Sequence, residues 1–231
     1  MTPRLPRRKA LSAMLFISIL TGCGGDSTGP GTSLVEENGL TRDINAMVPS
    51  QLLATIEALG MPIHRGGSPP SIEGVFHITP FVLVDSNRPG DTPGDRYADY
   101  YVEFSDQSNA NLTITTDYVN AEEVGVGLGS FIVGQGGQFS VFTELTVEIN
   151  GEAASVLAVY SGRMGQSSVE NMHAAGFMLD NNGNPSGYFI DDGQGRVFRD
   201  QDGASLRITA LPAALGVMAD GFTSGGFVHS P

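Results

Sequence analysis

Residues 138–161 read QFSVFTELTVEI, then NG, then EAASVLAVYS. In the first twelve residues apolar and polar side chains largely alternate, which is the period of a β-strand with one buried face. Asn150-Gly151 favours a two-residue type I′ turn between antiparallel strands. The segment from Ala153 to Ser161 is apolar on both of its faces. Together the two segments predict a β-hairpin at the centre of the fold.

The same two-residue period continues from this hairpin in both directions along the chain. Turns rich in Gly, Asn and Asp separate the apolar segments. We expect about nine or ten strands, near residues 75–84, 99–104, 112–117, 124–132, 138–149, 153–161, 169–179, 188–190, 196–199 and 205–210. The segment 124–132 is expected to turn its glycines at 125, 127 and 129 to one face and its even-numbered residues to the other.

Strands joined in sequence by short turns favour an up-and-down antiparallel sheet. A sheet of this length curls or closes, because open edges expose unpaired backbone groups. The predicted fold class is therefore all-β and mainly antiparallel, as an up-and-down meander β-barrel. A two-sheet β-sandwich is the alternative. The apolar, glycine-rich tail at 211–231 is left unassigned.

One short helix is predicted before the strands, from Gln51 to Leu59, because its apolar residues recur at helical spacing. Ser50 is the expected N-cap, and Gly60 is expected to end the helix. We therefore expect a single β-rich domain over residues 49–231, led by this one helix.

The first 22 residues have the features of an export signal. Four basic residues and no acidic ones precede an apolar run from Ala10 to Leu20. Eleven residues of helix rise about 16 Å, roughly half the thickness of a bilayer's hydrocarbon core. The run therefore predicts the apolar part of a signal peptide rather than a membrane span.

The tetrad Leu20-Thr21-Gly22-Cys23 resembles the lipobox of bacterial lipoproteins. The resemblance implies that residues 1–22 are removed and that Cys23, the only cysteine, is lipidated. It also implies a location in the bacterial cell envelope, and Gly24 behind the cysteine favours the outer membrane. Residues 23–48 would then form a lipidated flexible tether, since 24–33 are all small, polar or helix-breaking.

Two wider resemblances concern the domain. A short helix before the first strand, together with Gly74-Val75-Phe76, resembles calycins, the lipocalin-like barrels, although the chain has no tryptophan where lipocalins carry one. This resemblance implies a barrel that holds a small ligand. The run from 69–74 through 196–200 is also similar to uncharacterised bacterial lipoproteins, and that similarity implies no activity.

The composition excludes one class of partner. Four of the 12 basic residues lie in the first nine positions, so the chain after residue 22 has eight basic residues against 25 acidic ones, a formal charge of −17. It contains no lysine, because Lys9 is the only one. Such a surface repels the phosphates of nucleic acids and anionic lipids. We therefore expect no nucleic-acid partner, and basic partners fit better.

No motif predicts a catalytic or metal site. The four histidines have no metal-ligand spacing, and a triad built from Ser161, His173 and an acid is less favoured than a reading of both as ordinary strand residues. We expect no cofactor and no enzyme activity. Polar residues on otherwise apolar strands are the candidates for orienting a ligand: Tyr101, Tyr160, Arg163 and His173.

Two functions follow from these expectations. The first is a non-enzymatic envelope lipoprotein that binds a small apolar or amphipathic ligand inside a β-barrel. The alternative is a structural or protein-interaction lipoprotein with a filled core, whose partner the sequence does not identify. An open interior favours the first and a filled interior the second.

The anchor predicts the behaviour of a single substitution. Cys23→Ser removes the thiol that receives the lipid, so the protein should move from the membrane fraction to the soluble fraction, measured by ultracentrifugation of cell lysates. Ser27→Ala, four residues away, is the control and should leave the distribution unchanged. A Cys23→Ser protein that remains in the membrane fraction contradicts the anchor.

Overall fold

The computed structural model of the chain describes residues 33–213 and 226–228. These residues form an all-β fold of two helices and eleven antiparallel strands, which confirms the predicted fold class. The elements are α1 (Arg42–Met47), α2 (Ser50–Ala58), β1 (Gly74–Ile78), β2 (Phe81–Ser86), β3 (Arg96–Tyr97), β4 (Tyr100–Ser108), β5 (Thr113–Asn120), β6 (Glu123–Gln135), β7 (Gln138–Ile149), β8 (Glu152–Met164), β9 (Ser168–Asp180), β10 (Gly195–Asp200) and β11 (Ala204–Ile208).

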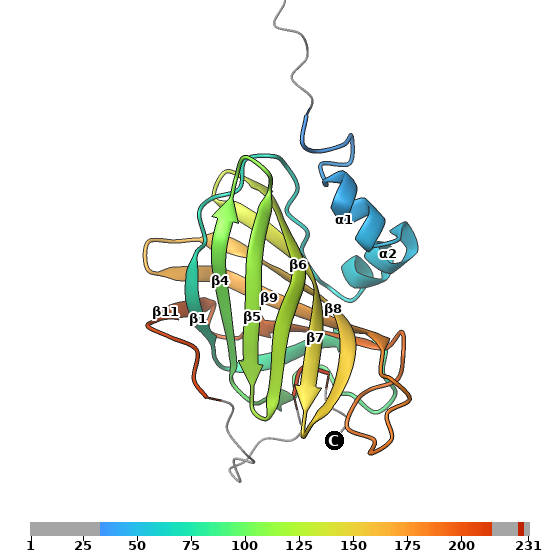
Figure 1. The fold of residues 1–231 in the computed structure, drawn as a ribbon. Coiled ribbons are helices and arrows are strands. Elements are labelled where there is room, and N and C mark those ends of the chain that lie inside the picture. Colours follow the sequence, from blue (N-terminus) through green and yellow to red (C-terminus); the bar gives the residue numbers. More distant parts are fainter. Residues whose placement is uncertain (1–32, 214–225, 229–231) are drawn as a thin grey trace, which may run out of the picture. The chain divides into compact units, whose positions relative to one another are not determined.

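Eight of the strands close into a ring, because β11 pairs with β1 on one side and with β9 on the other. β4 to β9 follow one another round the ring in sequence order (Figure 1). β9 is long enough to pair twice: Ser168–Glu170 with β11, and His173–Phe177 with β10. β10, β2 and β3 then extend the sheet beyond the ring. The ring is consequently uneven, and barrel-like and sandwich descriptions both fit it.

Side chains that point into the ring form the larger of two cores. Most are aromatic or branched aliphatic, and the largest are fully buried. Their rings touch across the interior: Phe104 lies edge-on to Tyr160 at a centroid distance of 5.6 Å and to Phe139 at 6.3 Å. The interior of the described ring is therefore occupied by its own side chains.

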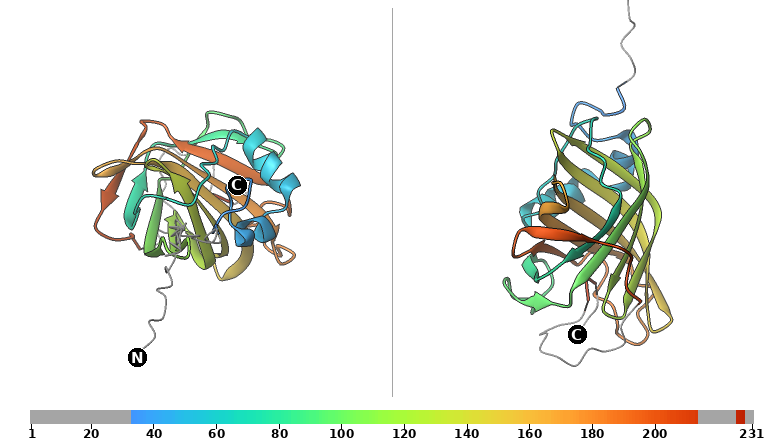
Figure 2. Two further views of the ribbon diagram at one scale, coloured as in Figure 1. Left: turned by 90° about the horizontal axis from the view of Figure 1, so that it is seen from above. Right: turned by 90° about the vertical axis from the view of Figure 1, so that its left-hand side faces the viewer.

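The second core lies outside the ring, under the helices. Ile44 of α1 and Ile56 of α2 pack against Phe142, Leu157 and Val159, which point outward from β7 and β8. Figure 2 shows both helices on the outer side of the ring of strands. β8 is apolar on both faces for this reason: one face lines the interior and the other is covered by helices.

The folded part begins earlier than the sequence predicts. Residues 33–48 belong to the compact unit, and α1 is a second helix in a segment that was expected to be a tether. Thr41 caps it, since its Oγ1 accepts a hydrogen bond from Ile44 N at 3.1 Å. Leu40 is fully buried in the outer core. The helix expected at 51–59 is confirmed as α2, although its N-cap is Pro49, with no side-chain cap in place of the expected Ser50. The signal peptide and Cys23 lie outside the described residues.

A bulge in β6 changes which of its side chains are buried. The register with β7 shifts between Gly127 and Gly129, so the alternation expected for residues 124–132 reverses there. Ser130 and Ile132 are buried rather than on the outer face with Val126, which is half exposed. The sequence gives no sign of this reversal, because glycines at alternate positions fit a regular strand equally well.

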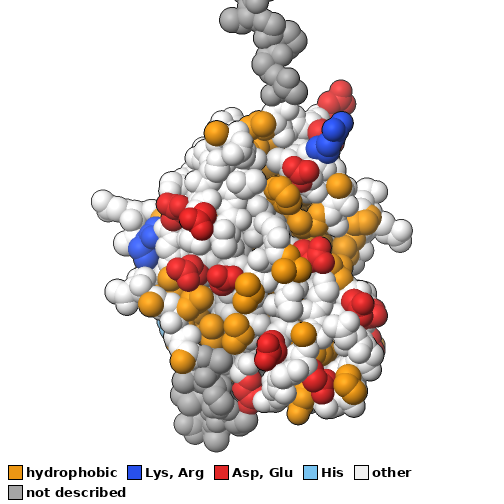
Figure 3. Space-filling view, in the orientation of Figure 1, with side chains coloured by type: hydrophobic (Ala, Val, Ile, Leu, Met, Phe, Trp, Pro, Cys, Tyr) orange, Lys and Arg blue, Asp and Glu red, His pale blue; other side chains and the backbone are white. Residues whose placement is uncertain are grey.

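The outer face over β4 to β7 is polar and acidic. Figure 3 shows acidic side chains spread over this face, with basic side chains only near its margins. Val126 and Leu128, beside the bulge, are exposed apolar residues among them. In the part of the chain that the structure describes, neither helix has the length and hydropathy needed to cross a membrane.

The bulged strand offers a matched pair of glycine substitutions. A Cβ at Gly125 would lie 2.0 Å from Cε1 of Tyr118, whereas at Gly129 it would meet no atom within 4 Å. Gly125→Ala should lower the free energy of unfolding by about 1–3 kcal/mol through overpacking. Gly129→Ala should leave it unchanged or raise it by about 0.4–1 kcal/mol, since alanine restricts the unfolded chain. Urea unfolding measures both, and equal effects would contradict the placement of Tyr118 over Gly125.

Candidate functional site

The four residues predicted to orient a ligand do not share one site. Tyr160 points into the ring, where its hydroxyl lies 2.6 Å from that of Tyr100. Tyr101 is half-buried and stacks on His77 with the ring centroids 4.3 Å apart. His77 is in turn bonded to Asp99, with Nε2 and Oδ2 3.0 Å apart. This histidine–tyrosine stack is separate from the interior.

The other two predicted residues lie on β8 and β9. Arg163 is exposed, and its Nη1 donates to the carbonyl of Gly136 at 3.2 Å. His173 lies opposite Ser161 in the ladder, and its Nδ1 is 3.0 Å from the carbonyl oxygen of Asn171. Burial lowers the pKa of His173, and the charge of Arg199 adds to this, although the bond to Asn171 acts the other way. The Ser161 hydroxyl has no hydrogen-bond partner among the described residues, so Ser161 and His173 form no nucleophile–base pair here.

Three tyrosines bring hydroxyl groups into the interior. Tyr100 stacks on Tyr118 at 4.9 Å and on Phe81 at the same distance, and its hydroxyl meets that of Tyr160. All three tyrosines are fully buried. Burial raises the pKa of each hydroxyl, so all three are neutral at physiological pH and act through hydrogen bonds.

A buried carboxylate marks the end of the ring at which these tyrosines lie. Glu123, the first residue of β6, is 1% exposed. The Tyr118 hydroxyl donates to its Oε1 at 2.5 Å, and the backbone N–H of Val228 donates to Oε1 at 3.2 Å and to Oε2 at 3.3 Å. We call this the plugged end of the ring, lined by Tyr100, Tyr118, Glu123 and Arg196 and covered by Gly226–Val228.

Arg196 is a buried cation at the plugged end, and its partner is Asp91. It is fully buried, and Nε and Nη2 donate to the two carboxylate oxygens of Asp91 at 2.7 and 3.0 Å. Arg88 also donates to Asp91, at 2.9 Å. Burial by itself raises the pKa of Asp91, but the hydrogen bond and charge of Arg196, with smaller help from Ser86 and Arg88, bring it below the ordinary value.

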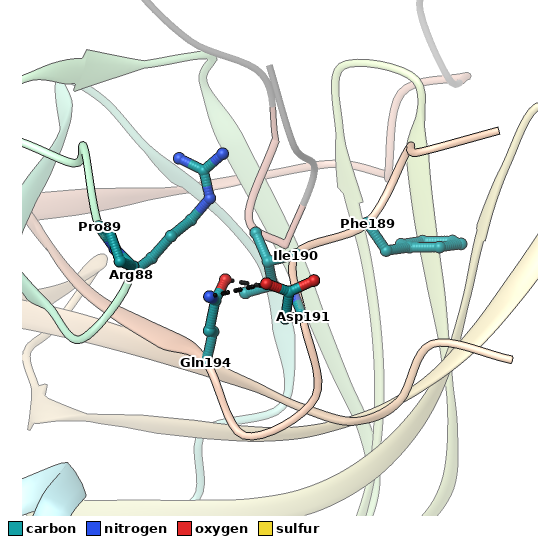
Figure 4. A pocket seen from close by; sticks show the side chains of 6 residues that line it. All are labelled: Arg88, Pro89, Phe189, Ile190, Asp191 and Gln194. Carbon is teal, nitrogen blue, oxygen red and sulfur yellow. Dashed lines mark hydrogen bonds between the residues drawn. The ribbon is translucent and has the colours of Figure 1, made fainter. Parts of the chain in front are cut away.

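An open pocket of about 200 Å³ lies beside the plugged end. Its lining comes from two loops and consists of Arg88, Pro89, Phe189, Ile190, Asp191 and Gln194. In Figure 4 Arg88 and Phe189 lie on opposite sides, and Asp191 and Gln194 face each other between them. Gln194 donates to Asp191 at 3.1 Å, which fixes both side chains. The wall of the pocket continues into the plug, because Ile190 N donates to the carbonyl of Val228 at 3.1 Å.

The residues of the plugged end were missed by the sequence analysis, although some carry a signal. Tyr118 lies at an inward position of an alternating strand. Arg196 is two residues from the inward-pointing Phe198 on the same strand, so the alternation places it inward as well. A charged residue at an inward position predicts a buried ion pair. Its partner, Asp91, is 105 positions away and carries no local signal.

Within residues 33–213 and 226–228, no group of three or more His, Cys, Asp or Glu side chains is placed to hold a metal ion. No protein-family model, curated protein or solved structure matches this chain.

The buried ion pair predicts a large effect at one arginine and a small effect at its neighbour. Arg196→Met leaves the Asp91 carboxylate buried without its main partner, so the free energy of unfolding at pH 7 should fall by about 3–5 kcal/mol. Arg199→Met, at an exposed position of the same strand, should change it by less than about 0.5 kcal/mol.

The Arg196–Asp91 pair also makes the free energy of unfolding depend on pH. Because the folded-state pKa of Asp91 is lowered, the stabilisation is present above the unfolded pKa of about 3.9 and is lost as the pH falls through the folded value. In urea titrations the gap between wild type and Arg196→Met should therefore narrow below about pH 4. A gap that is constant from pH 7 to pH 3 would refute the pairing.

Proposed function

We propose that the chain is an exported, lipid-anchored protein of the bacterial cell envelope that acts by binding a protein partner, with a filled core. The observation that carries this proposal is the pair of loops at the plugged end, which hold a preformed pocket on an acidic molecule. The resemblance of residues 20–23 to a lipobox supports the anchor.

The loops that form the pocket are tied to each other and to the sheet. Asn87 Nδ2 donates to the carbonyl of Gly193 at 3.0 Å, and Gly195 N donates to Asn87 Oδ1 at 2.6 Å. The Arg196–Asp91 pair fixes the first loop from inside. A surface that is rigid before binding loses little conformational entropy on binding, which favours affinity.

The size of the pocket favours a side chain of a partner over a whole small molecule. Its volume of about 200 Å³ is below the roughly 300–1,000 Å³ of typical ligand pockets. Asp191 supplies a carboxylate at its rim, and the chain as a whole is strongly acidic. Charge complementarity therefore favours a basic segment of another envelope protein.

The filled interior also favours binding of a protein partner over binding of a small ligand inside the ring. An apolar ligand inside the ring would have to take the place of rings that already touch each other, such as Tyr160, Phe104 and Phe139. The strand that is apolar on both faces gave the ligand hypothesis its main support, and its second face is covered by α1 and α2. A small ligand within the ring remains a prediction from the resemblance to calycins.

Site-specific photo-crosslinking in living cells tests the binding face. A photoreactive phenylalanine replaces Pro89, an exposed residue of the pocket, and in a matched strain it replaces Ala110, an exposed residue in the β4–β5 turn at the opposite end of the strands. We expect a discrete crosslinked envelope protein from position 89 and not from position 110, and adding Asp191→Asn should reduce its yield. Equal crosslinking at both positions, or none at either, would overturn the proposal.

A further inference from the structure

Residues Gly226–Val228 fill the plugged end as a bound peptide fills a site. Phe227 and Val228 are fully buried. The ring of Phe227 lies edge-on to Tyr100 at 5.0 Å and to Tyr118 at 5.5 Å, and it contacts Phe198 at 5.8 Å. These three residues belong to no strand, yet they occupy the space that the surrounding strands leave.

The backbone of the segment is held by groups from three separate parts of the fold. Arg196 Nη1 donates to the carbonyl of Gly226 at 3.3 Å, and Ile190 N donates to the carbonyl of Val228. In the other direction, Val228 N–H donates to Glu123. An aromatic ring in an aromatic-lined space, with polar groups paired to the peptide on either side, is how peptide-binding sites achieve specificity.

We propose that the plugged end is a binding site for an aromatic-containing peptide segment, and that Gly226–Val228 occupies it as an internal plug until a competing segment displaces it. The proposal goes beyond binding at the neighbouring pocket, because it places a second site inside the ring. The ligand class follows from the contacts: an aromatic side chain followed by a backbone N–H for Glu123 and preceded by a carbonyl for Arg196.

The glycine at position 226 fits the plug closely to the site. A Cβ added to Gly226 would lie 2.1 Å from Oε2 of Glu123 and 2.9 Å from Oδ1 of Asn120, so the space beside this residue is closed to a side chain. Asn120 is fully buried, and its Oδ1 has no hydrogen-bond partner among the described residues. An occupant of the site must therefore have no side chain at the position before its aromatic residue.

Glu123 sets which hydrogen-bonding group the site accepts. Its carboxylate receives donors from Tyr118 and Val228, and the neighbouring Arg196 is already paired in bidentate fashion with Asp91. An occupant that brings an N–H to Glu123 replaces what the plug supplies.

The test uses the full chain and the peptide acetyl-Gly-Phe-Val-amide, which copies residues 226–228. In wild type the plug belongs to the same chain and competes intramolecularly, so the peptide should bind weakly. The Phe227→Ala variant should bind it at least tenfold more tightly in calorimetric or NMR titrations. The analogues acetyl-Gly-Ala-Val-amide and acetyl-Gly-Phe-Pro-amide lack the aromatic ring and the N–H equivalent to that of Val228, respectively. Each should bind at least tenfold more weakly to this variant.

Phe139→Ala is the matched control, because it removes a buried phenylalanine from the interior without touching the plug. It should gain no affinity for the peptide. The proposal is overturned if folded Phe227→Ala protein binds the peptide no better than wild type, or if Phe139→Ala gains equally.

Hydrogen exchange of the wild-type chain decides the matter if Phe227→Ala does not fold. Exchange of the Val228 amide through a local opening, well ahead of amides in β4 and β5, supports a displaceable plug. Exchange of this amide only together with those strands, at the rate of global unfolding, overturns it.

Discussion

β7 and β8 pair over twelve consecutive residues, from Gln138 opposite Arg163 to Ile149 opposite Glu152, and no bulge interrupts the register. β8 has no polar face along most of this length, so water must be excluded from both of its sides. Curling of the sheet into a ring buries one side, and α1 and α2 bury the other. Each further feature of the fold, including the closure through β11, extends one of these two layers.

Closure of the ring creates the conditions for a buried charge cluster at one end. The interior of the ring shields side chains from water, so a charged side chain placed there needs a partner within the protein. Arg196 obtains one from Asp91 in a loop more than one hundred residues away, and Glu123 obtains donors from Tyr118 and from the chain's C-terminal region. The plugged end is thus assembled from segments that only the closed topology brings together.

The sequence predicts the features of the fold that depend on local periodicity. Alternation predicts β7, the apolar segment after the Asn150-Gly151 turn predicts β8, and helical spacing predicts α2. It does not predict α1, because Leu40 and Ile44 form too short a pattern to be read as helical without the outer face of β8 to pack on. The bulge at Gly127 cannot be predicted from the sequence either, because a bulge depends on the register of two strands and not on the composition of one.

The candidate site is harder to predict than the fold, for a related reason. Tyr101, Arg163 and His173 were chosen because polar residues on apolar strands orient ligands, but they point outward from different strands, and only Tyr160 points inward. Inward and outward positions on β8 look alike in sequence, because both are apolar. The two faces can be distinguished only from the tertiary structure, in which helices cover the outward face.

The burial of Arg196 also affects the charge of the molecular surface. The chain after residue 22 has only eight basic residues, all arginines, and this one lies wholly inside the fold. Arg88, beside the pocket, is itself engaged with Asp91. Removing positive charge from the surface in this way leaves carboxylates such as Asp191 to dominate the loops at the plugged end, while the outer face over β4 to β7 is acidic as well. Attraction to anionic lipid is therefore weak over these surfaces, and the field they produce favours approach of a basic segment toward the loops.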